Sequence, residues 1–221
     1  MKRDICYGTD FEERVASFLE SNGHKVYRSV YAQLGRRKCQ IDLVVFDGVL
    51  PIVIECKGWD AKKIIYKRSA NFWNYVDVAG KVRQVSNPLR QAKNHIEILT
   101  ANIRNDIEGT LESGRTIGGY EYRLFLKGDI PDYKSERLFT ERSYDEFLES
   151  VTYSDEDINL FPDDYKKAVS AWLEEHSDVS KERLKEHKEY LKECKANRTG
   201  VFDENEYRSP LCSSWEHDSW G

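Results

Sequence analysis

The fold is decided by Gln40-Ile-Asp42-Leu-Val-Val-Phe-Asp-Gly48-Val-Leu-Pro-Ile-Val-Ile-Glu55-Cys-Lys57-Gly58. Two apolar runs flank Asp47-Gly48, a dipeptide that favours a tight turn between antiparallel strands. Runs of this kind are typical of central, buried strands. Pro51 inside the second run leaves the length of the turn open. The stretch therefore predicts a buried β-hairpin.

Three charged residues interrupt these apolar strands. If the strands pair directly across Asp47-Gly48, then Asp42 lies opposite Val53 and Glu55 is its diagonal neighbour on the same face. Lys57 lies two residues further along that face. A register shift of one residue would move a whole strand to the other face. The predicted juxtaposition of Asp42, Glu55 and Lys57 therefore depends on this register.

Such a set suits the hydrolysis of a phosphodiester bond. Two carboxylates such as Asp42 and Glu55 can hold Mg²⁺, a hard ion that prefers oxygen ligands and keeps several waters. A lysine such as Lys57 can stabilise the developing negative charge or orient the water. A surface ion pair is the alternative interpretation, but the apolar flanks argue against it because unpaired buried charges are costly.

The rest of the chain alternates between helical and strand patterns. Thr9 and Glu12 match a capping box at the start of the first helix, and Asn87-Pro88 is a strong start signal for another. We expect helices over 8–22, 87–103, 143–151, 162–176 and 179–197. We expect strands over 24–31, 120–126 and 137–140. The remaining segments are a basic connection over 33–38, a loop with short strands over 58–86, a loop over 105–119 and a polar tail over 201–221.

The composition suits a soluble globular protein. The chain has 221 residues, and its five cysteines are scattered without metal-ligand spacing, which argues against a disulfide framework or a structural zinc site. No apolar run reaches the length of a membrane span, and the N-terminus lacks the apolar region of a signal peptide. We expect a cytoplasmic protein that does not contact membranes.

Charge is distributed unevenly. Residues 1–105 carry 18 Lys and Arg against 11 Asp and Glu, and residues 106–221 carry 16 against 28. A polyanion would therefore meet the first half, unless the difference is the ordinary fluctuation of charge along a soluble chain. Aromatic and basic residues also gather over 59–83, where Trp59, Phe72 and Trp73 could stack on bases or pack in the core. The candidate phosphate contacts are Arg36, Arg37, Lys38, Lys62 and Lys63.

Four motifs stand in order along the chain: Gly8-x-x-Phe-Glu12 on the first predicted helix, Gln40-Ile-Asp42, Glu55-Cys-Lys57-Gly-Trp59, and Asn87-Pro-x-x-Gln91 on a later predicted helix. Together they resemble the PD-(D/E)xK nuclease superfamily, and most closely its nuclease-related (NERD) and Mrr-like groups. One departure is Ile41, which stands where the superfamily often has proline. The resemblance covers roughly residues 8–127.

The resemblance implies an α/β fold in which a mixed central sheet flanked by helices carries the site. It implies that Asp42, Glu55 and Glu12 bind Mg²⁺ or Mn²⁺, and that Lys57 and Gln91 complete the catalytic set. A capping role for Glu12, and a capping or packing role for Gln91, remain alternatives. His95 is interpreted as a residue on the helix flank. We assign residues 1–152 to the nuclease domain, 153–200 to an acidic helical extension and 201–221 to a tail.

We therefore expect a metal-dependent nuclease that cleaves DNA, with restriction or phage defence as the associated role. A catalytically inactive DNA-binding or assembly subunit is the alternative. The acidic C-terminal region could form a homodimer or contact a protein partner.

Overall fold

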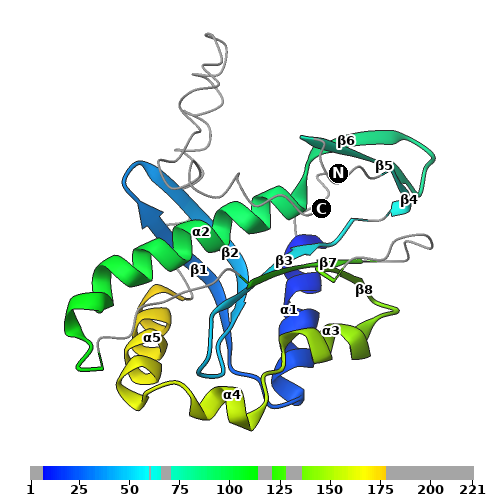
Figure 1. The fold of residues 1–221 in the computed structure, drawn as a ribbon. Helices are drawn as coiled ribbons and strands as arrows, with labels where there is room; N and C mark the ends of the chain where they lie inside the picture. Colours follow the sequence, from blue (N-terminus) through cyan, green and yellow to red (C-terminus); the bar gives the residue numbers. More distant parts are fainter. Residues whose placement is uncertain (1–6, 60, 66–70, 114–120, 128–135, 178–221) are drawn as a thin grey trace, which may run out of the picture. The chain divides into compact units, whose positions relative to one another are not determined.

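The protein was analysed as a computed structural model that describes residues 7–59, 61–65, 71–113, 121–127 and 136–177 (Figure 1). The chain divides into two compact units, Met1–Ser180 and Lys181–Gly221, and the second unit lies outside the described residues. The helix expected over 179–197 and the tail over 201–221 therefore also lie outside them. The description below concerns the first unit.

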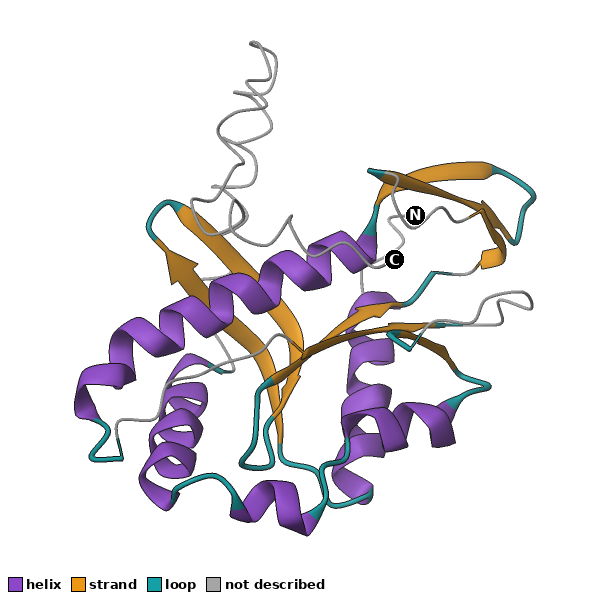
Figure 2. Cartoon of the chain, in the orientation of Figure 1, coloured by secondary structure: helices purple, strands orange, loops and turns teal. Residues whose placement is uncertain are grey.

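A five-stranded mixed sheet forms its centre (Figure 2). Its order is β1 (Val26–Leu34), β2 (Arg37–Val45), β3 (Ile52–Lys57), β7 (Glu121–Leu126) and β8 (Leu138–Thr140). The strand β2 is antiparallel to both β1 and β3, whereas β7 runs parallel to β3 and β8 runs parallel to β7. The α/β fold with a mixed central sheet is thus confirmed.

Helices cover both faces of this sheet. They are α1 (Tyr7–Ser21), α2 (Pro88–Ile107), α3 (Tyr144–Val151), α4 (Asp155–Asn159) and α5 (Asp163–His176), with a 3₁₀ turn at Glu108–Thr110. Side chains of α1 and α3 share one core cluster, while α2 and α5 contribute to the cluster on the other face. Within the described residues, no helix is both long and apolar enough to cross a membrane.

The helix α2 forms as the sequence predicted. Asn87 caps it by accepting hydrogen bonds from the backbone N–H groups of Leu89 and Arg90, at 3.0 and 3.4 Å. Proline occupies the first helical position, where its missing N–H costs nothing. The apolar stripe of α2 is buried along its whole length and comprises Leu89, Ala92, Ile96, Leu99 and Ile103.

One connection differs from its prediction and another adds to it. The stretch expected to be a basic connection is a hairpin whose strands meet across Gly35-Arg36, where Gly35 adopts a φ of 59° that glycine tolerates. The short strands expected over 58–86 are present, and they pair into a second, antiparallel sheet. Its strands are β4 (Ala61–Ile65), β5 (Phe72–Asp77) and β6 (Val82–Ser86).

The predicted extension begins inside the domain. Tyr165, Val169, Trp172 and Leu173 of α5 are buried in the same cluster as α2. The Tyr165 hydroxyl donates a hydrogen bond of 2.9 Å to the backbone oxygen of Val49. A domain boundary at residue 152 would cut through this core, so the observed packing places α5 within the domain.

The strand β1 changes its alternation at Ser29. Tyr27 and Val30 both contribute to the α2 cluster, although regular alternation would put residues three apart on opposite faces. Between them Ser29 adopts a φ of 49°, which is the one positive value among the described non-glycine residues. The preceding residue, Arg28, turns instead toward α1.

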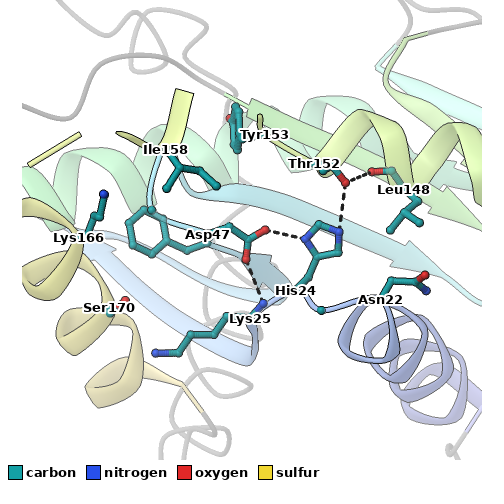
Figure 3. Close-up of a pocket in the computed structure, with 13 residues that line it drawn as sticks. Asn22, His24, Lys25, Asp47, Leu148, Thr152, Tyr153, Ile158, Lys166 and Ser170 are labelled. Carbon is teal, nitrogen blue, oxygen red and sulfur yellow. Dashed lines mark hydrogen bonds and ion pairs between the residues drawn. The ribbon is translucent and has the colours of Figure 1, made fainter. Parts of the chain in front are cut away.

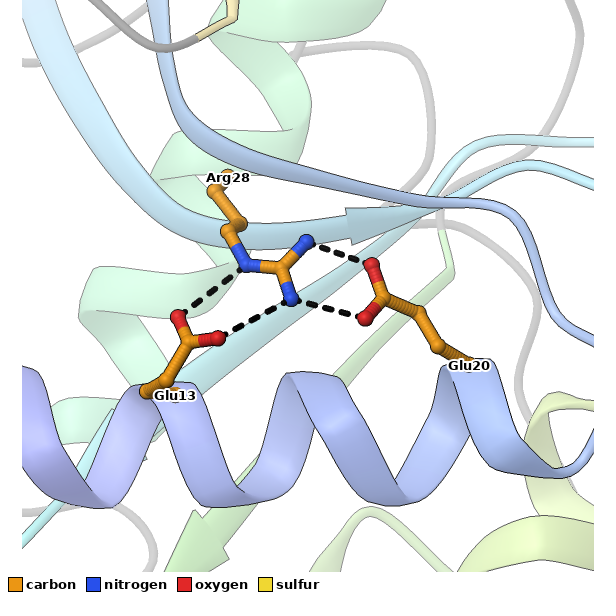
Figure 4. A network of polar contacts seen from close by, with 3 residues as sticks. All are labelled: Glu13, Glu20 and Arg28. Carbon is orange, nitrogen blue, oxygen red and sulfur yellow. Dashed lines mark hydrogen bonds and ion pairs between the residues drawn. The ribbon is translucent and has the colours of Figure 1, made fainter.

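Arg28 fastens this irregular point to α1 (Figure 4). Its guanidinium donates to both oxygens of Glu13, at 3.2 and 3.3 Å, and to both oxygens of Glu20, at 2.5 and 2.8 Å. A planar guanidinium suits such forked pairing with carboxylates. The contacts fix how α1 lies against β1, and therefore where the neighbouring Glu12 is placed.

Substitutions at Ser29 test this backbone irregularity. Ser29→Val should lower the free energy of unfolding by about 1–3 kcal/mol, because a β-branched residue is strained at positive φ. Ser29→Gly should stay within about 1 kcal/mol of the parent, because glycine relieves that strain but loses more chain entropy on folding. Urea unfolding measures both changes. Ser86→Val, on an exposed strand position of ordinary φ, is the control, and an equal loss there would contradict the argument.

Candidate functional site

The strands β2 and β3 bring Asp42 and Glu55 together in a register that differs from the predicted one. Leu43 pairs with Ile54, and Val44 pairs with Val53. The pairing is shifted by two residues because residues 46–51 form a six-residue loop instead of a two-residue turn. A shift of two keeps the same face. Continued by one residue, the register sets Asp42 opposite Glu55.

Asp42 lies where the β2–β3 ladder ends. The backbone pairs stop at Leu43 and Ile54, and the N–H group of Cys56, two residues further along β3, donates to the Asp42 carboxylate at 2.9 Å. Ile41 and Val44 both face the α2 cluster, so β2 changes its alternation here as β1 does at Ser29. The half-buried carboxylate thus takes the place of a backbone acceptor at an irregular point of the sheet.

Glu55 is completely enclosed, with an exposed fraction of 0%. Its Oε1 accepts a hydrogen bond from Lys57 Nζ, and its Oε2 lies 3.1 Å from His95 Nδ1. Burial by itself would raise the pKa of Glu55, but Lys57 and His95 outweigh burial and lower the pKa below the ordinary value. Glu55 therefore carries a negative charge at neutral pH.

Asp42 and Lys57 respond to this charge in different ways. Burial and the repulsion of Glu55 raise the pKa of Asp42 well above its ordinary value, and the attraction of Lys57 offsets only part of the rise. Burial would lower the pKa of Lys57, but Glu55 and Asp42 outweigh it and raise the pKa. The surroundings thus raise the pKa of Asp42, lower the pKa of Glu55 and keep Lys57 protonated.

The Glu12 side chain, on α1, lies close enough to Lys57 and Glu55 for their charges to affect it. The side chain is half-buried, and burial raises its pKa, with Lys57 lowering it and Glu55 raising it by smaller amounts. The capping alternative for Glu12 does not hold, because α1 begins at Tyr7 and Thr9 lies within the helix instead of at its cap. Glu13, the next residue, is instead engaged by Arg28.

The helix α2 contributes a residue that the sequence analysis did not assign to the site. His95 is buried, with an exposed fraction of 7%, and faces Glu55. Gln91 lies one turn earlier and is half-buried, and no described hydrogen bond joins its side chain to Asp42, Glu55 or Lys57. The interpretation of His95 as a flank residue was wrong. Its spacing, three residues after Ala92 and four before Leu99 of the buried stripe, was the signal that could have revealed it.

The donor set fits a hard divalent cation. Within the described ranges, no group of three His, Cys, Asp or Glu side chains is arranged to hold a metal ion. Mg²⁺ does not require such a group, because it is commonly held by one or two carboxylates together with waters and substrate phosphates. A cation between Asp42 and Glu55 would also relieve the repulsion that raises the pKa of Asp42.

The predicted phosphate contacts lie on two different hairpins. Arg37 donates to Asn94 and lies 3.8 Å from Glu97, so α2 engages it. Arg36 is exposed in the turn and Lys38 is half-buried in β2. Lys62 and Lys63 are both exposed on β4.

The aromatic residues of this region divide between core and surface. Trp73 is 1% exposed, which confirms the packing alternative for that ring. Trp59 stacks on Tyr75 with ring centroids 5.1 Å apart, and this contact joins the end of β3 to the three-stranded sheet. Phe72 is exposed and remains available to a ligand.

A cavity of about 700 Å³ lies elsewhere in the domain (Figure 3). His24 lies in its wall, with Nδ1 2.6 Å from Asp47 and Nε2 3.3 Å from the Thr152 hydroxyl, and Thr152 donates to the Leu148 carbonyl at 2.8 Å. These contacts tie the loop after β2 to the end of α3. None of the five predicted catalytic residues is among the residues that line the cavity.

Comparison with protein families matches residues 7–117 to the nuclease-related domain, abbreviated NERD. The matched range contains α1, the β2–β3 pair and α2, and thus all five predicted catalytic residues. Comparison with curated proteins gives no match.

Replacing Asp42 tests the electrostatic description. Its pKa in the native state is raised above the ordinary value, so the native state holds the proton more tightly than the unfolded chain does. The free energy of unfolding therefore falls as the pH rises from the ordinary pKa of an aspartate to the raised pKa of Asp42. This loss of stability remains at pH 7. Asp42→Asn should raise the melting temperature at pH 7 in EDTA, and this gain should shrink toward pH 3–4.

Calorimetry at several pH values measures this difference. Glu175→Gln removes an exposed charge from α5 and serves as the control, with little expected change. A melting temperature of Asp42→Asn that is lower than that of the parent at pH 7, or a difference that does not depend on pH, would contradict the description.

Proposed function

Because the chain belongs to the nuclease-related domain family, we propose that it is a metal-dependent nuclease that hydrolyses phosphodiester bonds of DNA. The observation that carries the proposal is the coupled arrangement of Asp42, Glu55 and Lys57 at the end of β3. Two facing carboxylates and a protonated lysine supply the charges that phosphodiester hydrolysis requires.

In this proposal Asp42 and Glu55 hold Mg²⁺ or Mn²⁺. When bound, such an ion polarises the phosphate and lowers the pKa of a coordinated water. Lys57 remains protonated because Glu55 and Asp42 raise its pKa, so it cannot accept a proton from water at neutral pH. Its role is to donate hydrogen bonds to the phosphate and to stabilise the charge that develops there.

Glu12 and Gln91 have supporting roles in the proposal. Glu12 adds a third carboxylate from α1, close enough to Lys57 and Glu55 to sense both charges. It could bind the ion through a water or accept a proton, since burial raises its pKa. Gln91 is proposed to contact the substrate, because no described contact ties its side chain to the carboxylates.

The three-stranded sheet is the proposed platform for the nucleic acid. It follows β3 directly and leads directly into α2, so it is inserted between Lys57 and His95. Lys62 lies five residues after Lys57, and a fully extended chain of that length spans at most about 18 Å. Lys62 and Lys63 can therefore contact phosphates near the bond that is cleaved, and the exposed Phe72 offers a ring for stacking.

A non-catalytic nucleic-acid-binding module is the second candidate. One observation favours it: side chains of the protein itself, Lys57 and His95, already lie against both oxygens of Glu55. Such a module would bind DNA without cleaving it, and the ion pair of Glu55 and Lys57 would serve only to stabilise the fold. The two candidates differ in whether cleavage requires Lys57 and a divalent ion.

Cleavage assays separate the candidates. Incubation of labelled DNA and RNA with Mg²⁺ or Mn²⁺ should yield cut products from DNA, and EDTA should abolish the reaction. Lys57→Gln should reduce the rate constant by about 10²–10³-fold, since it removes charge stabilisation from the transition state. DNA binding in EDTA should persist in this variant.

The control is Lys93→Gln, which removes an exposed lysine from α2 and should cleave like the parent. Binding without cleavage under any divalent ion would favour the non-catalytic module. Cleavage that is indifferent to Lys57 would rule out the proposed role of this residue.

The salt dependence of DNA binding tests the platform. Lys62→Gln/Lys63→Gln should weaken binding, and the slope of log K against log salt should become shallower by about 2 units, since each phosphate contact contributes about 0.9. Fluorescence anisotropy in EDTA measures the slope. Lys93→Gln/Lys167→Gln removes the same charge from two helices and should leave the slope unchanged, so equal slopes for the two double variants would contradict the platform.

A further inference from the structure

His95 occupies a fixed place on α2. The helix is capped by Asn87, and Ala92, Ile96 and Leu99 bury its core-facing side. His95 is itself 7% exposed, so its ring has little freedom to move. A residue in such a place can hold a second side chain in a defined orientation.

The side chain that it faces is Glu55. The two oxygens of Glu55 meet partners from two different elements: Lys57 on the same strand engages Oε1, and Nδ1 of His95 on α2 lies 3.1 Å from Oε2. No hydrogen bond within the described residues engages either Glu55 Oε2 or His95 Nδ1, so their 3.1 Å approach is a close electrostatic contact. Contacts at both oxygens restrict the rotation of the carboxylate about its last bond.

We infer that His95 is a positioning residue that orients the Glu55 carboxylate toward Asp42 from the helix side. The inference rests on the proposed function of Asp42 and Glu55 as cation ligands, and it adds the residue that presents one of them. Groups that orient a ligand in this way typically alter metal affinity or activity by about 10–100-fold when they are replaced.

A purely structural role is the competing explanation. In that case His95 would matter because its ring fills space between α2 and the sheet, and an apolar residue of similar shape would replace it. Asparagine and leucine make a matched pair for this question, because they branch at the same atom and differ in polarity. Asn can place an N–H donor close to the position of Nδ1, whereas Leu places a methyl group there.

The test measures Mn²⁺ binding to the full chain without nucleic acid, by calorimetry or by electron paramagnetic resonance. His95→Leu should weaken Mn²⁺ binding by about 10–100-fold, and His95→Asn should stay within a few-fold of the parent. DNA cleavage should follow the same order. A parent-like affinity in His95→Leu, or equal losses in the two variants, would overturn the inference.

A second measurement keeps the inference separate from the proposed function. Urea unfolding in EDTA of the parent, Glu55→Gln, His95→Leu and the double variant tests the contact between the two residues directly. The shift in unfolding midpoint caused by His95→Leu should fall to less than half in the Glu55→Gln background. Additive shifts would overturn the inference. A parent chain that neither binds Mn²⁺ nor cleaves DNA, but shows this coupling, would instead refute the proposed function alone.

Discussion

A carboxylate with no exposed surface can keep its charge only if groups of opposite charge or hydrogen-bond donors enclose it. Glu55 meets this condition through Lys57 on its own strand and His95 on α2. The requirement links elements that are far apart in the sequence. Because His95 must reach the central strand, α2 has to cross the sheet at this level, and its buried apolar stripe holds it there. Loss of either partner would leave a buried charge without compensation.

Asp42 is in the opposite situation. It has one backbone donor, Cys56, while Glu55 and Glu12 repel its charge, so its pKa rises where that of Glu55 falls. The positive charge near these two facing carboxylates is therefore too small to offset the repulsion between them. This repulsion lowers the stability of the fold, but it also favours the binding of a cation. It occurs where β1 and β2 lose their regular alternation, at a point that Arg28 anchors to α1.

The strands β4–β6 are inserted between β3 and α2, the two elements that carry Glu55 and His95. The three-stranded sheet begins four residues after Lys57 and ends one residue before the cap of α2, so its ends are fixed by these two elements. Trp59 stacks on Tyr75, and Trp73 enters the main core. These contacts hold the small sheet to the domain, while Lys62 and Lys63 remain exposed. The proposed binding surface thereby lies on the same continuous segment of chain as three of the candidate catalytic residues, Glu55, Lys57 and Gln91.

The features that depend on local periodicity can be predicted from the order of residues alone. Apolar runs defined the central strands, Asn87-Pro88 defined the start of α2, and the parity of a strand placed Glu55 and Lys57 on one face. The partners that these residues contact depend instead on how distant segments pack together. The β2–β3 register moved by two residues because the loop is longer than Asp47-Gly48 suggested, and His95 gained its contact because α2 crosses the sheet there. Packing between distant segments sets such contacts, and local patterns carry no information about it.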